Sequence, residues 1–131
     1  MNHIAICAIP LLLVAALPGC SRTLHIELPN GSPVHLQTDE NKSGNSIVET
    51  RDILLQPDTP SYKRLQEWLV HNQEGWSQSM ATNPGGGIRV HAGDLHLQFV
   101  GGAVFTWTDK GQFQKEIRAE DYAFLKKPAG I

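Results

Sequence analysis

Four short runs between Ile88 and Arg118 constrain the fold more than any other part of the chain. Each run mixes apolar and polar residues, and glycine-containing turns separate it from the next; the runs cover 88–91, 94–100, 103–108 and 112–118. Short runs of this kind, with glycine at the turns, predict consecutive antiparallel strands rather than helices. We therefore expect a β-meander in the C-terminal part of the chain.

A helix is predicted to begin at Pro60 and to end by Gly75. Thr59 can cap its first turn, and proline suits the first helical position, where no backbone N–H is needed. Apolar side chains follow at helical spacing on one face, namely Tyr62, Leu65, Trp68 and Leu69. We interpret this stripe as core packing rather than as a ligand platform, because burial of such side chains stabilises a small domain. A short final helix is expected over 120–127.

Two alternating runs, 23–28 and 33–37, flank a Pro-Asn-Gly turn and predict an N-terminal β-hairpin. A two-residue turn would place the two apolar stripes on opposite faces, whereas a three-residue loop with Gly31 in the left-handed region aligns them. We therefore expect the bulged turn. The resulting pairs are Ile26 with Val34, Leu24 with Leu36, and His25 with His35 on the exposed side.

The segments between hairpin and helix complete the predicted architecture. The polar segment 39–46 has no periodicity and indicates a surface loop, and 47–56 is a weaker strand candidate. Strands, one main helix and further strands indicate an α+β domain in which an antiparallel sheet packs against the helix.

The first 19 residues have a different composition from the rest of the chain. Fourteen of them are apolar, against 39 of the remaining 112. The run Ile4 to Leu17 spans 14 residues, whereas a transmembrane helix needs about 20. We interpret residues 1–19 as a removable signal peptide. Residues 20–131 then form a single small domain, large enough for one hydrophobic core.

The signal segment ends in Leu17-Pro18-Gly19-Cys20, and here the chain resembles bacterial lipoproteins. Their lipobox is a leucine, two mostly small residues and a cysteine that becomes lipidated. The resemblance implies cleavage before Cys20, a diacylglycerol on its thiol and acylation of its new amino group. Several acyl chains give stable anchoring. Ser21, in the position where aspartate retains such proteins in the inner membrane, implies the periplasmic face of a Gram-negative outer membrane.

The alternative is an ordinary cleavage after Ala16, which would release a soluble periplasmic or secreted protein. With lipidation, the folded domain has no thiol to pair, because Cys7 leaves with the signal peptide and Cys20 would carry the lipid. The net charge of −2 provides no basic excess for binding a phosphate backbone, so we expect no nucleic-acid partner.

The polar face of the predicted meander presents a conflict. With two-residue glycine turns, Phe105 and Trp107 fall on the same face as Arg89, His91 and His96. Either a β-bulge returns the two aromatic side chains to the core, or they form a patch rimmed by the other three residues. We favour the bulge, because monomers seldom expose large apolar patches. If the patch forms, it is the best candidate binding face, since aromatic residues and arginine dominate interface energetics.

The same face suggests a metal site as a second interpretation. We expect His91 and Asp94 to flank a turn at Ala92-Gly93, with Arg89 opposite His96. Two imidazoles and a carboxylate suit zinc or copper ions. Solvated residues on the outer side of a sheet are the favoured interpretation, so we expect no metal.

No pattern indicates a cofactor or a catalytic group. The glycine run 83–87 leads into a strand rather than a helix and lacks the Gly-Lys-Ser/Thr of a phosphate loop, so we interpret it as a connector. The chain has no Gly-x-Ser-x-Gly nucleophile elbow. We therefore expect a non-enzymatic envelope lipoprotein that binds another protein or an envelope component. An inhibitor or immunity role and an accessory role in an envelope assembly both remain open, and a metal-binding protein or a cell-wall enzyme are the alternatives.

Overall fold

The computed structural model describes residues 21–41, 48–80 and 85–128, and the predicted signal peptide and Cys20 lie outside these ranges. The elements in chain order are β1 (Val34–Asn41), β2 (Val48–Leu55), α2 (Pro60–His71), β3 (Ser77–Gln78), β4 (Ile88–Ala92), β5 (Leu95–Val100), β6 (Ala103–Thr108), β7 (Gly111–Glu116), the 3-10 helix η1 (Ala119–Tyr122) and α3 (Ala123–Lys126).

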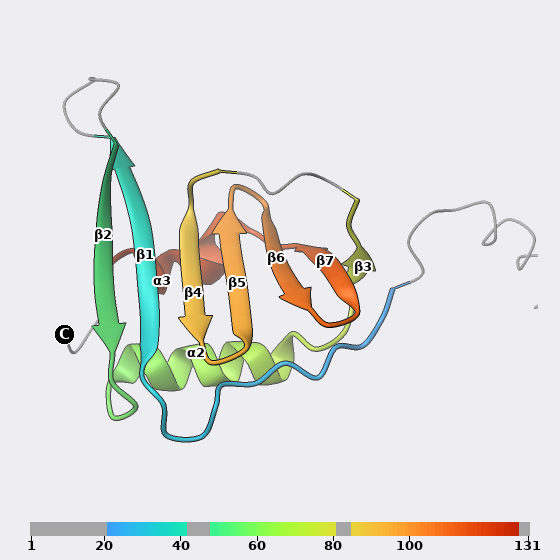
Figure 1. Cartoon of the computed structure of the whole chain (residues 1–131), viewed down its shortest axis with the longest axis horizontal. Coiled ribbons are helices and arrows are strands. Elements are labelled where there is room, and N and C mark those ends of the chain that lie inside the picture. The colour runs from blue at the N-terminus through green and yellow to red at the C-terminus, as the bar shows by residue number, and fades with distance from the viewer. Residues whose placement is uncertain (1–20, 42–47, 81–84, 129–131) are drawn as a thin grey trace, which may run out of the picture.

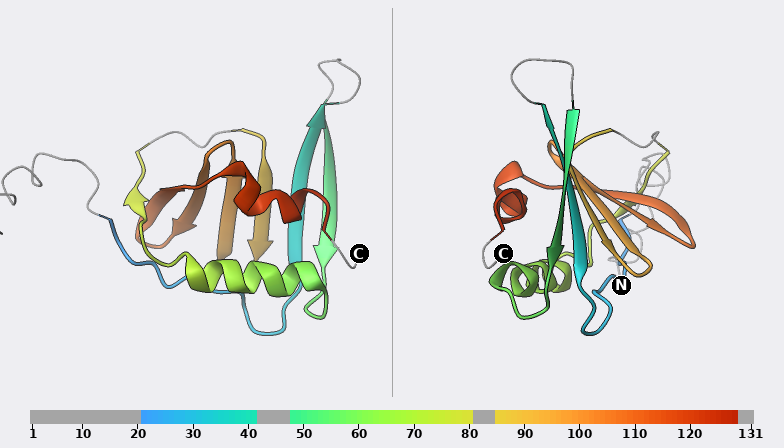
Figure 2. Two further views of the ribbon diagram at one scale, coloured as in Figure 1. Left: turned by 180° about the vertical axis from the view of Figure 1, so that it is seen from behind. Right: turned by 60° about the vertical axis from the view of Figure 1, so that its left-hand side comes forward.

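The strands form one seven-stranded antiparallel sheet with the order β2-β1-β4-β5-β6-β7-β3. The helices α2, η1 and α3 all lie on one face of this sheet (Figures 1 and 2). The expected α+β class with one main helix is thus confirmed. Within the described ranges, no helix has the length and apolar character needed to cross a bilayer.

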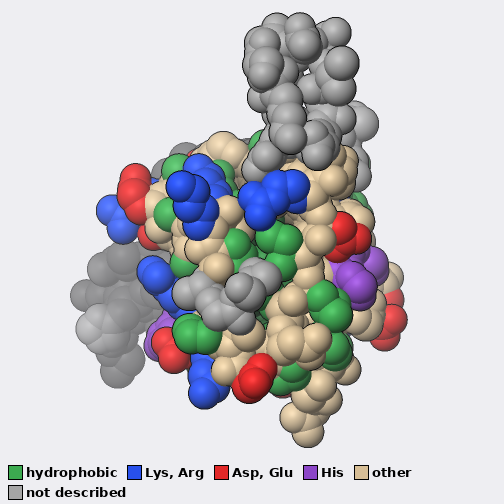
Figure 3. Space-filling model, turned by 90° about the vertical axis from the view of Figure 1, so that its left-hand side faces the viewer, with side chains coloured by type: hydrophobic (Ala, Val, Ile, Leu, Met, Phe, Trp, Pro, Cys, Tyr) green, Lys and Arg blue, Asp and Glu red, His purple; other side chains and the backbone are tan. Residues whose placement is uncertain are grey.

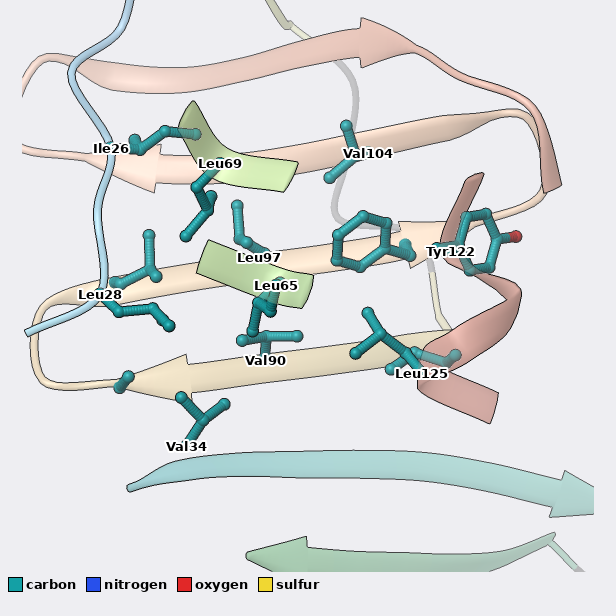
Figure 4. Close-up of a cluster of buried hydrophobic side chains, with 14 of the residues drawn as sticks. Ile26, Leu28, Val34, Leu65, Leu69, Val90, Leu97, Val104, Tyr122 and Leu125 are labelled. Atoms are coloured by element: carbon teal, nitrogen blue, oxygen red, sulfur yellow. The ribbon is translucent and has the colours of Figure 1, made fainter. Parts of the chain in front are cut away.

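The helix α2 begins as its sequence predicts. The Thr59 hydroxyl accepts a hydrogen bond from the Tyr62 backbone N–H at 3.3 Å, and Pro60 occupies the first turn. The inward-facing side chains Leu65 and Leu69 meet the sheet, as Figure 4 shows. The core cluster also includes Tyr122 and Leu125 from the C-terminal helices. One continuous layer of apolar side chains therefore joins the helices to one face of the sheet.

The predicted N-terminal hairpin is wrong. Residues 21–33 form no strand but a strap that runs along the ends of the strands beside α2 (Figures 1 and 4). The expected turn exists, since Ser32 N–H donates to Pro29 O at 3.2 Å and Gly31 has a φ of +71°. Ile26 and Leu28 nevertheless point into the core without pairing to β1. The alternation of apolar and polar residues in the strap therefore reflects the burial of one side of the segment. An extended segment can bury one side without pairing to a strand.

The strap has its own anchors. Arg22 and Trp76 exchange two backbone hydrogen bonds, and Leu24 N–H donates to Gln73 O at 2.7 Å. The Tyr62 hydroxyl donates to Ser32 O at 2.9 Å. An N-terminal hairpin is present, but β1 and β2 form it. Residues 39–41, predicted as the beginning of a loop, belong to β1, and residues 42–47 lie outside the described ranges.

The meander β4 to β7 is confirmed, with one correction to its first turn. The turn lies at Gly93-Asp94 rather than at Ala92-Gly93, so His91 pairs with His96 and Arg89 pairs with Gln98. Gly93 adopts a φ of +57°, which is costly for most other residues. This register keeps the small Ala92 side chain in the core.

Candidate functional site

The face of the sheet opposite the helices is called the open face here, because no described helix or strand covers it (Figure 2). Alternation along the strands places the following described residues on it: His35, Gln37, Asp39, Thr50, Asp52, Leu54, Ser77, Arg89, His91, His96, Gln98, Val100, Ala103, Phe105, Trp107, Gln112, Gln114 and Glu116.

Phe105 and Trp107 both lie on the open face, so the expectation of a bulge in β6 is wrong. The pairing of β5 with β6 runs without interruption from the Gly101-Gly102 turn, with Phe99 opposite Val104. The five residues proposed from the sequence as a binding face, Arg89, His91, His96, Phe105 and Trp107, therefore come together on one side of the sheet.

Thr106 explains why no bulge is needed. It takes the core position opposite Leu97 and is only 1 % exposed. Its hydroxyl donates to the carbonyl oxygen of His96 at 2.9 Å. A buried hydroxyl with a hydrogen-bond partner costs little, and so a threonine can occupy the core while two aromatic side chains point outward.

Three histidines form a row across adjacent strands of the open face. His35 on β1 lies opposite His91 on β4, which lies opposite His96 on β5. Trp107 continues the row on β6 and pairs with Gln112 on β7. Figure 3, which looks onto the β2 edge, shows histidine and acidic side chains gathered on the side of the open face. His35 is not among the residues predicted for the binding face, because the expected hairpin pairs residues 33–37 with residues 23–28 rather than with β4.

The central pair of this row is in direct contact. His91 Nδ1 and His96 Nδ1 are 2.7 Å apart, and the ring centroids are 4.9 Å apart in an edge-on arrangement. Burial lowers the pKa of His91, and the neighbouring His96, Arg89 and His35 lower it further, against an opposing effect of Asp52. The neutral form of His91 is therefore favoured, and one ring must donate while the other accepts.

Arg89 does not present a free positive charge on this face. Its guanidinium binds both carboxylate oxygens of Asp39, at 2.9 and 3.0 Å, and its Nε donates to Gln37 at 3.5 Å. Asp39 also accepts a hydrogen bond from the Thr50 hydroxyl at 2.9 Å. The hydrogen bond from Arg89 lowers the pKa of Asp39, and the same contact raises the pKa of Arg89. The pair is thus charged and mutually neutralised.

The two aromatic side chains differ in exposure. Phe105 is 8 % exposed although it lies outside the main core cluster, and its cross-strand neighbour Gln98 donates to Gly86 O at 2.8 Å. Trp107 is half-buried, and its indole N–H donates to Gln112 Oε1 at 3.0 Å. The exposed part of the predicted patch is therefore centred on Trp107.

Trp107 and His96 line two hollows. The smaller, called the face hollow, has a volume of about 290 Å³ and is lined by Arg89, His91, His96, Leu97, Gln98 and Trp107. The larger, called the strap hollow, has a volume of about 630 Å³ and lies between the strap and the ends of β5 and β6. Both hollows therefore meet the half-buried Trp107 side chain.

The metal hypothesis finds no support in this geometry. Asp94 lies in the β4–β5 turn rather than opposite His91. Within the part of the chain that the structure describes, no three His, Cys, Asp or Glu side chains are grouped closely enough to hold a metal ion. The Nδ1 atoms of His91 and His96 instead face each other.

In comparisons with known proteins, no family model, no curated protein and no solved structure matches the chain.

Proposed function

We propose that the chain is a non-enzymatic envelope lipoprotein, anchored through Cys20 to the periplasmic face of the outer membrane, whose open face binds another protein. The observation that carries the proposal is the position of Trp107, half-buried and hydrogen-bonded beside two hollows on a face without a covering helix. Tryptophan is among the residues that contribute most to binding when a partner covers them.

The surroundings of Trp107 support a protein partner. The row of His35, His91 and His96 offers flat imidazole rings beside it, and the Arg89 guanidinium is already paired with Asp39. The centre of the face is therefore rich in flat rings, and its arginine is already paired, which suits a binding surface with a desolvated core. Lipid anchoring of the same chain would restrict the partner to the envelope.

Site-directed photo-crosslinking in intact cells of the native host tests the binding face. A photoreactive amino acid at Gln114, on the open face, is expected to capture one specific protein; the same amino acid at Lys63, exposed on α2, is the control. Trp107→Ala in the Gln114 background should abolish the product. Crosslinks from Lys63 alone, or a Gln114 product that survives Trp107→Ala, would overturn the proposed face.

The anchor requires a separate experiment. Cys20→Ala should prevent labelling of the protein by radioactive palmitate and release it from the outer-membrane fraction. A Cys20→Ala protein that still fractionates with the outer membrane contradicts the lipoprotein proposal. Cys7→Ala is the matched control, since that residue would leave with the signal peptide.

A further inference from the structure

The strap begins at the edge of the sheet formed by β3, called the β3 end here. Arg22 and Trp76 form an antiparallel bridge, in which Arg22 N–H donates to Trp76 O at 2.6 Å and Trp76 N–H donates to Arg22 O at 3.1 Å. Trp76 is fully buried and directly precedes β3. The start of the strap, drawn in blue, therefore lies at the β3 end, and β2 lies at the opposite edge of the sheet (Figures 1 and 2).

Almost no tether separates this end of the fold from the proposed lipid anchor. Only Ser21 stands between Cys20 and Arg22, and two residues of extended chain span at most about 7 Å. The headgroup layer of a bilayer is itself about 5 to 7 Å thick on each side. Lipid chains on Cys20 would therefore hold the β3 end at the headgroups, because Arg22 is already part of the folded domain.

Two cationic side chains lie at the β3 end without a carboxylate partner. Arg22 is exposed, and its guanidinium carbon lies 5.6 Å from the centre of the Phe113 ring. Lys115 follows Phe113 on the same face of β7, and its ammonium donates to Glu74 O at 2.5 Å. Within the described ranges, neither cation forms an ion pair. Both therefore keep a positive charge that attracts lipid phosphates.

Charge favours the β3 end over the strap as the surface that meets the bilayer. Within the described part of the chain, the strap hollow and a second hollow between the strap and α2 both contain Glu27 and Asp94, and neither is lined by lysine or arginine. At the β3 end, two cations balance the exposed carboxylates of Glu74 and Glu116. Anionic phospholipids attract cations and repel carboxylates, so the strap is the less favourable contact.

We propose that the β3 end of the sheet rests on the phospholipid headgroups of the membrane, with Arg22 and Lys115 facing lipid phosphates. This inference rests on the proposed function, because it takes Cys20 as the lipid anchor. It also sets the height of the binding face: Trp107 on β6 lies two strands from β3, about 10 Å at the ordinary strand spacing. A partner that covers Trp107 must therefore bind close to the membrane surface.

The test uses the full-length lipidated chain in vesicles of phosphatidylethanolamine and phosphatidylglycerol whose headgroups carry a fluorescence quencher. A fluorophore is attached through Gln78→Cys in β3, Leu54→Cys in β2 or His25→Cys in the strap, all three at exposed positions. We expect strong quenching at Gln78, weaker quenching at His25 and none at Leu54. A flexible Gly/Ser linker of about 20 residues after Ser21, which separates its ends by roughly 25 Å, should abolish the quenching at Gln78. The same linker after Ile131 is the control and should leave it unchanged.

A pair of charge variants tests the phosphate contact. Arg22→Gln with Lys115→Gln should lower the quenching at Gln78. The matched variant, Lys63→Gln with Lys127→Gln, removes two exposed cations from the helices' side and should not. Thermal melting in detergent checks that both double variants are folded, and Arg22→Gln alone is a milder variant with a smaller loss expected.

The outcomes separate this inference from the proposed function. Equal quenching at Gln78 and Leu54, stronger quenching at His25 than at Gln78, or a Gln78 signal that survives the linker after Ser21 overturns the membrane contact while the lipid anchor stands. Unchanged quenching in the Arg22 and Lys115 double variant overturns the phosphate contact. A chain that takes up no palmitate and does not associate with the vesicles overturns the proposed anchor itself, and this inference with it.

Discussion

The Nδ1 atoms of His91 and His96 lie 2.7 Å apart across β4 and β5, close enough that the two rings share one hydrogen bond. A proton on both Nδ1 atoms at once would place two donors against each other. The hydrogen bond therefore exists only while at least one Nδ1 is unprotonated. Protonation of both rings should break this contact at the centre of the open face.

The stability of the protein should fall as the pH drops below about 6.5, the ordinary pKa of histidine. Burial lowers the pKa of His91 below the ordinary 6.5. The facing groups His96, Arg89 and His35 lower it further, and Asp52 has the opposite effect. The unfolded chain then binds more protons than the folded chain in this range, and the free energy of unfolding decreases as pH falls. Urea unfolding at several pH values, with the full-length protein in micelles, measures the slope.

A His91→Gln variant should reduce that slope. His25→Gln is the control, because His25 is exposed on the strap and has no hydrogen bond within the described ranges. Equal slopes for the His91→Gln variant and the unmodified chain would show that the His91–His96 contact does not set the pH dependence.

Removal of the Asp39 carboxylate should destabilise the fold by about 1 kcal/mol, the scale of one partly exposed charged hydrogen-bonding group. Asp39 joins β1 to Arg89 of β4 and to Thr50 of β2, and its side chain is 21 % exposed. Because its pKa is lowered in the folded state, its contribution is present at neutral pH and disappears as the pH falls through that lowered value. Urea unfolding of Asp39→Asn at pH 7 measures the loss, and Glu116→Gln, an exposed carboxylate on the same face, should change stability far less.

Alanine substitutions at Gly86 and Gly87 should differ sharply in cost. Both residues have positive φ, of +79° and +74°, so each substitution strains the backbone by about 1 kcal/mol. A Cβ at Gly87 would also collide with the carbonyl oxygen of Phe99, whereas a Cβ at Gly86 meets nothing within 4 Å. Gly87→Ala should therefore lower the melting temperature well beyond Gly86→Ala. Similar melting temperatures would contradict the close approach of Gly87 to β5.

Local signals explain which elements the sequence predicts correctly. The helix from Pro60 has a cap and an apolar stripe within one segment, and the meander has glycine turns between neighbouring strands. The strap fails as a strand because alternation reports burial on one side and does not specify a hydrogen-bonding partner. Thr106 likewise occupies the core only because its hydroxyl reaches the carbonyl of His96.

The candidate site depends more on distant pairing than the fold class does. The five residues predicted for the binding face lie within the meander, and so the short turns between neighbouring strands are enough to predict that they share a face. His35 and Asp39 join them only through the pairing of β1 with β4, between residues about fifty positions apart. No turn joins β1 to β4, so no local signal fixes their register. Alternation in β1 predicts that His35 and Asp39 share a face, but it does not predict which strand lies beside them.

Replacement by alanine should destabilise the protein much more at Trp76 than at Trp107. Trp76 is fully buried in the core cluster, and its indole N–H donates to Asn72 O at 2.7 Å. Trp76→Ala should therefore cost about 3 to 5 kcal/mol, as for other large core side chains. Trp107 is half-buried on the open face, outside that cluster, so Trp107→Ala should cost only about 1 kcal/mol. Urea unfolding followed by far-UV circular dichroism compares the two; equal losses would place Trp107 in the core and remove it as a binding residue.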